Sequence, residues 1–107
     1  TILYLDLDLI IASNIDHLFS YEPKRWCTIR DFTRVQRPLW EKYNSSVVRF
    51  NTGQLTNVWE LFKKDHKAIE SKYHGDQDWL YFVTSTSNPA ALYPDSWIKS
   101  WKWENWK

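Results

Sequence analysis

Two carboxylates with the spacing of a metal site stand near the start of the chain. Asp6 and Asp8 directly follow the apolar run of residues 2–5. Carboxylate oxygens are the ligands that Mg²⁺ and Mn²⁺ prefer, and these ions keep coordination positions open for water and substrate phosphates. Surface acids match the same D-x-D pattern by chance in many proteins, so the rest of the chain must decide whether this pair is a site.

The elements around the two acids place them where ligands usually bind. A run of large apolar side chains bounded by carboxylates predicts a buried strand over residues 2–5 whose C-terminal end carries both acids. In α/β proteins, ligands bind at that end of the strands.

A second acidic cluster, Asp76-Gln77-Asp78, follows Gly75. It stands at the start of a predicted helix, where the helix dipole favours a negative charge by about 0.3–1 kcal/mol. A structural role is therefore open beside a functional one. With only two glycines in the chain, a loop whose backbone amides cradle phosphate is excluded, so any phosphate would need a metal ion or the basic side chains.

The spacing of apolar residues predicts the remaining elements. Residues 55–73 carry apolar side chains at helical intervals, which predicts one long helix capped by Thr56 or Asn57 and ended by Gly75. A shorter helix is predicted over residues 76–84. Strands are predicted at 26–30, 46–50 and 97–103, a helical turn at 15–19, and loops at 31–38 and 85–94.

Composition limits the class of protein. A chain of 107 residues is at most one domain. The net charge of +1, with acids and bases interspersed, argues against a nucleic-acid partner, and no apolar run approaches the ~20 residues of a membrane span. Cys27 is the one cysteine, which fits a reducing, cytoplasmic location. The eight tryptophans indicate either a tryptophan-rich core or aromatic platforms for sugars.

Three segments, in order, resemble the motif set of GT-A-fold glycosyltransferases of the retaining type related to bacterial galactosyltransferases and glycogenin. Residues 4–8 resemble the strand that ends in D-x-D, residues 43–51 the F-N-A-G-like turn that enters a strand, and residues 74–80 the D-Q-D segment that opens a helix. The resemblance implies an α/β fold with a GT-A-like mixed sheet and flanking helices. It also implies a metal-dependent transferase that moves a sugar from a nucleotide-sugar, such as a UDP-sugar, to a saccharide or other hydroxyl acceptor.

The resemblance also implies roles for individual residues. Asp6 and Asp8 would hold Mn²⁺, or Mg²⁺, under the diphosphate of the donor. Asp76 and Gln77 would be the catalytic residues beside the donor sugar, with Asp76 bonded to hydroxyl groups and Gln77 near the anomeric carbon. The substrate-binding residues would be Asn44, Ser46 and Asp78.

Glycosyltransferases of this kind place a nucleotide-binding βαβ half before the D-x-D strand, whereas this chain begins at that strand. We therefore expect residues 1–107 to be the C-terminal portion of such a domain, with an exposed sheet edge that promotes self-association. Two other interpretations stay open. One is a non-catalytic carbohydrate-binding or interaction fragment. The other is a haloacid-dehalogenase-like phosphatase with Asp6 as nucleophile and Asp8 as acid/base, although such enzymes have an apolar strand before the acids that Gly75-Asp76 resembles, and residues 70–74 are largely polar.

Overall fold

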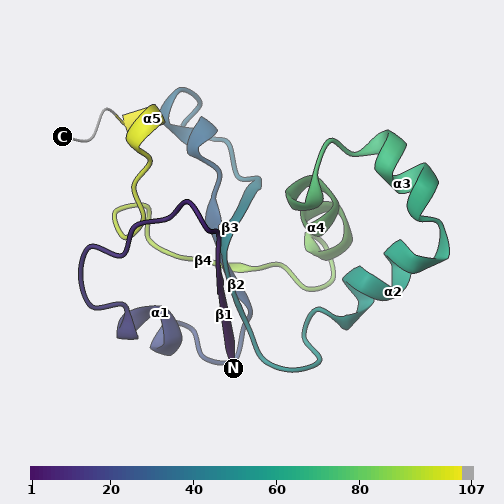
Figure 1. Cartoon of the computed structure of the whole chain (residues 1–107), viewed down its shortest axis with the longest axis horizontal. Helices are drawn as coiled ribbons and strands as arrows, with labels where there is room; N and C mark the ends of the chain where they lie inside the picture. The colour runs from purple at the N-terminus through teal and green to yellow at the C-terminus, as the bar shows by residue number, and fades with distance from the viewer. Residues whose placement is uncertain (105–107) are drawn as a thin grey trace.

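A mixed β-sheet lies at the centre of the computed structural model, which describes residues 1–104 (Figure 1). Within these residues four strands are hydrogen-bonded in the order β1-β3-β2-β4. Their bounds are Ile2–Leu5 for β1, Cys27–Arg30 for β2, Tyr43–Phe50 for β3 and Ala91–Leu92 for β4. β3 runs antiparallel to β1 and β2, while β2 and β4 are parallel. The prediction of an α/β fold with a mixed sheet is confirmed.

The strand that carries the D-x-D acids is an edge strand. Within the described residues, β1 pairs with β3 alone, so the expectation of a fully buried strand is wrong. Leu3 and Leu5 pack against the core on one face of the sheet, whereas Ile2 and Tyr4 on the other face are each 50% exposed. All four side chains are large and apolar or aromatic, so their residue types do not reveal which of them face the core and which face solvent.

Each face of the sheet has its own core. On one face, Leu18 of α1 (Asp16–Ser20) packs with Cys27, Ile29, Val47 and Tyr93. On the other, helix α4 (Asp76–Thr84) covers β3, and Leu80 packs in a cluster whose other members are Trp26, Tyr43, Val48 and Ala90. Figure 1 shows α1 and α4 on opposite sides of the strands. The helices predicted at 15–19 and 76–84 are therefore confirmed, and α4 is the one that positions acids near β1.

The long helix predicted over residues 55–73 is two helices, α2 (Thr56–Lys64) and α3 (His66–Lys72). Asp65 breaks it with φ −155° and ψ 53°, far from helical values. Neither helix has a buried residue, because both extend beyond α4 and away from the sheet (Figure 1). Leu55 occupies the N-cap position without a side-chain bond, so the predicted caps Thr56 and Asn57 are wrong.

Gly75 does not end a helix as expected. α3 ends at Lys72, followed by extended Tyr73, and Gly75 is the N-cap residue of α4. Among residues 1–104, none of the helices combines the length and the apolar character that crossing a membrane requires.

The predicted strand at 97–103 is also wrong, since the chain forms helix α5 there (Trp101–Glu104). One Glu104 oxygen accepts a hydrogen bond from the Ser100 amide at 3.2 Å and lies 3.4 Å from the Arg34 guanidinium. These contacts favour a helical turn over an extended strand. The loop predicted at 31–38 contains a 3₁₀ helix, η1 (Phe32–Val35). The loop predicted at 85–94 contains strand β4, whose Ala91 amide donates to the carbonyl of Trp26, the residue before β2, at 2.9 Å.

Candidate functional site

The three motif segments meet at one end of the sheet. Because β1 and β3 are antiparallel, the end of β1 lies beside the start of β3, with Leu5 opposite Val47. The Asp6 amide donates to the Ser46 carbonyl at 2.9 Å and continues this pairing. The start of α4 reaches the same place, where the Ser45 hydroxyl donates to Oδ1 of Asp76 at 3.3 Å. Acids from two motifs and a hydroxyl from the third are thus brought together.

The backbone turns directly after β1. Leu7 and Asp8 form a turn in which the Leu9 amide donates to the Asp6 carbonyl at 3.2 Å. In a continuous strand Asp6 and Asp8, two residues apart, would point to the same face, and the turn takes Asp8 out of that arrangement. Asp6 is half-buried and Asp8 is exposed, so both carboxylates are open to solvent.

Tyr4 belongs to the site, although the sequence did not single it out. Its hydroxyl donates to Oδ1 of Asp6 at 2.7 Å. This bond and the negative charge of Asp6 raise the pKa of Tyr4 above its usual value, and burial and the charges of Asp76 and Asp8 raise it further. The three acids therefore act together on one phenol. Since Tyr4 stands two residues before Asp6, strand alternation was a signal that could have found it.

A bulge in β3 replaces the turn expected before residue 46. Thr28 pairs with Val48, but the next residue of β2, Ile29, pairs with Asn44, so residues 45–47 bulge from β3. The Thr28 hydroxyl, fully buried, lies 2.9 Å from the Asn44 carbonyl and 2.8 Å from the Val47 carbonyl. Bulges often re-aim side chains beside active sites, and this one places Ser45 against Asp76.

The side chain of Asn44 supports the bulge from within. Its Oδ1 accepts from the Ser46 amide at 3.0 Å, and its Nδ2 donates to Oδ1 of Asp31 at 3.2 Å. The Ser46 hydroxyl is buried and has no hydrogen-bond partner in the described part of the chain. Asn44 therefore has a framework role, and its role toward a sugar stays a prediction, as does that of Ser46. Asp31 and Thr28 complete this framework, and no sequence pattern marked them.

The acidic cluster at the start of α4 divides between two hollows. Residues two apart on a helix are about 200° apart around its axis. Asp76 lines a groove between α4 and the strands β1 and β3, whereas Asp78 lines a hollow on the other flank of the helix with Lys42 and Lys72. Gln77 stands between them and is half-buried.

The groove joins the acids to an apolar surface. Its volume is about 320 Å³, with Tyr4, Ser45 and Asp76 on its polar side. Its apolar walls are Ile2, Val48, Phe50, Val58, Trp79 and Leu80. The Trp79 indole N–H donates to the Val58 carbonyl at 3.1 Å, which fixes this ring between α2 and α4. A concave apolar site with a few convergent polar groups is the usual form of a small-molecule site.

The acids at the end of β1 do not make a complete metal site by themselves. Among residues 1–104, no group of three or more His, Cys, Asp or Glu side chains is placed to hold a metal by itself. In the same range none of Asp6, Asp8 and Asp76 forms an ion pair with lysine or arginine. Mg²⁺ and similar ions are commonly held by one or two carboxylates with phosphates and waters as the other ligands.

Comparison with protein-family models, with curated proteins and with solved structures found no match to this chain.

Proposed function

We propose that this chain is the metal-binding and acceptor-side part of a GT-A-like, metal-dependent glycosyltransferase. The observation that carries the proposal is the meeting of three segments that are far apart in the sequence. The end of β1, the bulge of β3 and the start of α4 come together around Tyr4, Ser45 and Asp76. These are the segments on which the resemblance to glycosyltransferases rests.

Asp6 and Asp8 would hold the Mn²⁺ or Mg²⁺ ion. When bound, such an ion supplies Lewis acidity that stabilises the charge of a departing nucleoside diphosphate. Tyr4 keeps one oxygen of Asp6 oriented, which leaves the other oxygen free.

The sugar would lie between the acids and the groove. Asp76, held by Ser45, would accept hydrogen bonds from donor hydroxyls, and Gln77, next along α4, would stand beside the anomeric carbon. The saccharide or other hydroxyl acceptor would occupy the groove, where Tyr4 and Trp79 offer aromatic surfaces. Ser46 and Asn44 would support the binding of the donor sugar through the bulge of β3. Asp78 would contact substrate from the opposite flank of α4.

Calorimetric titration with a UDP-sugar tests this proposal. We expect binding that requires Mn²⁺ and that weakens by about tenfold or more in Asp8→Asn, because ligand loss should cost at least as much as loss of an outer-shell partner. Asp16→Asn, which removes an exposed acid on α1, is the matched control and should keep full affinity. Donor binding that ignores both the metal and Asp8 would reject the transferase site.

A carbohydrate-binding module is the second candidate, supported by the aromatic walls of the groove. It predicts that a saccharide binds without metal and that Trp79→Ala abolishes this binding while Asp8→Asn does not. The phosphatase interpretation has less support, because helix α3 and not an apolar strand precedes the acids of α4. Phosphatase activity that the unsubstituted chain shows and that Asp6→Asn loses would instead favour the phosphatase interpretation.

A further inference from the structure

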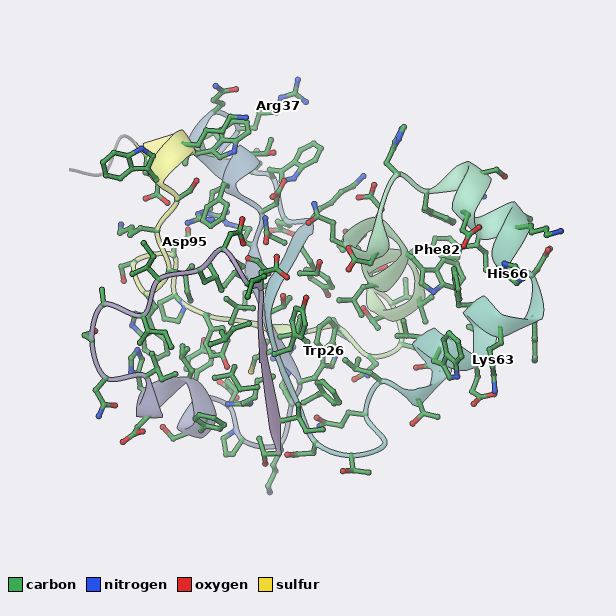
Figure 2. All side chains as sticks on the ribbon, viewed as in Figure 1. Trp26, Arg37, Lys63, His66, Phe82 and Asp95 are labelled. Atoms are coloured by element: carbon green, nitrogen blue, oxygen red, sulfur yellow. The ribbon has the colours of Figure 1, made fainter. Side chains whose placement is uncertain are left out.

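A second hollow lies on the flank of α4 that faces away from the D-x-D acids. Its volume is about 280 Å³. Tyr81, Phe82 and Ser85 line it from α4 and the residue after it, Lys72 and Tyr73 from the end of α3, and Lys42 from the segment before β3. Figure 2 shows Phe82 on the side of α4 that faces α2 and α3. Three separate parts of the chain therefore build this hollow.

One of the aromatic rings that line the hollow, that of Phe82, is held open to solvent. Phe82 is 57% exposed, yet its ring lies 5.4 Å from the Tyr73 ring and is stacked 5.8 Å from the Trp79 ring. Burying a phenylalanine stabilises a fold, so an exposed ring fixed by two neighbours forgoes stabilisation. A ring fixed in this way presents a flat apolar face that a ligand finds already formed.

Two lysines also line the hollow. The Lys72 ammonium lies 5.6 Å from the Tyr73 ring centroid and 5.9 Å from that of Phe82, and the Lys42 ammonium lies 6.0 Å from that of Tyr81. Neither lysine is in an ion pair in the part of the chain that the structure describes. Asp78 is the one acid among the lining residues, so the hollow carries a net positive charge.

We infer that this hollow binds an acidic saccharide, with the carboxylate or phosphate between Lys42 and Lys72 and one face of the sugar ring on Phe82. Asp78 and Ser85 would serve the hydroxyl groups. An anionic group can pair with both ammonium groups at once, whereas a neutral sugar cannot. The exposed Phe82 ring offers an apolar contact for a sugar ring, which a free anion would leave unused. The inference needs no metal and does not rest on the proposed transferase activity.

The competing explanation is that the two lysines only cover aromatic surface with their stems. Lys63 offers a matched example of that arrangement, since its ammonium lies 5.8 Å from the Trp59 ring centroid on α2 and is paired with Glu60 at 3.0 Å. Lys63 lines neither hollow. It is therefore the control for lysine–aromatic contact without a binding site.

An amide-shift NMR titration of the whole chain, without divalent ions, tests the inference with glucuronate, glucose 6-phosphate, glucose and inorganic phosphate. We expect shifts at Lys72, Phe82 and Ser85 with glucuronate, glucose 6-phosphate or both, and the responding compound identifies the anion. Lys42→Gln/Lys72→Gln should weaken this binding about tenfold or more, since hydrogen bonds to charged groups are stronger than those between neutral groups. Lys63→Gln should leave it unchanged.

Three outcomes would overturn the inference. Glucose could shift the same amides with the same affinity as its acidic relatives, which would remove the role of the lysines. Inorganic phosphate could bind as tightly as glucose 6-phosphate, which would leave a simple anion site. The double lysine variant, shown to be folded by circular dichroism, could bind as the unsubstituted chain does.

Discussion

Tyr4 is the residue of the candidate site on which all three acids act. Its hydroxyl bonds to Asp6, and its pKa is raised by Asp6, Asp76 and Asp8. A group that orients a metal-binding carboxylate acts as an outer-shell partner, and such partners commonly change metal affinity by about 10–100-fold. In the proposed metal site Tyr4 would therefore be a positioning residue, which touches the Asp6 carboxylate and not the ion.

Tyr4→Phe should lower Mn²⁺ affinity by about tenfold, because the ring stays in the groove while the bond to Asp6 is lost. Electron paramagnetic resonance of free Mn²⁺ measures this without any donor sugar. Tyr73→Phe, in the hollow on the other flank of α4, is the control and should not change the affinity. Equal Mn²⁺ affinities in Tyr4→Phe and the unsubstituted chain would remove Tyr4 from the site.

At the scale of elements, the bulge of β3 places the polar groups. Regular antiparallel pairing would keep β3 in continuous register with β2. Instead, residues 45–47 bulge out of β3 and bring Ser45 to Asp76. The Thr28 hydroxyl stands between two carbonyls of the bulge, and its single hydrogen serves one of them at a time. The bulge is thus held by the neighbouring strand as well as by Asn44 of its own strand.

Thr28→Val should lower the free energy of unfolding by about 1–3 kcal/mol, because a buried carbonyl of the bulge loses its donor while the side-chain shape is kept. Denaturant unfolding measures the change. Thr84→Val is the matched control, since Thr84 is equally buried but its hydroxyl bonds to the Leu80 carbonyl four residues earlier in the same helix. The Leu80 carbonyl lies within helix α4, so the loss in the free energy of unfolding should be smaller in Thr84→Val than in Thr28→Val. Similar losses in both variants would contradict the role given to Thr28.

At the scale of the whole molecule, the free edge of β1 is the feature with consequences for assembly. Within residues 1–104, β1 is hydrogen-bonded on one side only, and Ile2 and Tyr4 are half-exposed beside that edge. Unpaired edges with apolar side chains are templates for pairing with another chain. We therefore predict self-association of the chain through β1.

Sedimentation velocity should show an average mass that rises with protein concentration. Ile2→Lys should reduce this rise, because a charged side chain on an edge strand opposes edge-to-edge pairing. Ile10→Lys, which changes an isoleucine that is 90% exposed outside the strand, is the control. A single monomeric species for the unsubstituted chain over the whole concentration range would contradict the prediction.

Local patterns in the sequence were sufficient for the elements that carry the acids. The apolar run before Asp6, the strand that ends near Phe50 and the helix that starts at Asp76 are all where these patterns placed them. Each depends on neighbours within a few residues, through side-chain alternation in strands or the helix dipole at an N-terminus. Asp6 could therefore be placed at the end of a strand from the sequence alone.

Interactions between distant residues decided the rest. Arg49 of β3 is buried, with 2% of its surface exposed. Its guanidinium donates hydrogen bonds to the carbonyls of Leu18 and Arg25, and no local sequence pattern predicts these contacts. Glu104 makes a helical turn by pairing with Arg34, seventy positions earlier in the chain. The same holds for the site: the sequence by itself determined acids at a strand end and a helix start. Only the tertiary structure decided that Asp76 shares a groove with Tyr4 while Asp78 lines the hollow on the other flank of α4. The physical reason is that strand order, the bulge and the rotation of α4 depend on contacts between segments, which local spacing does not encode.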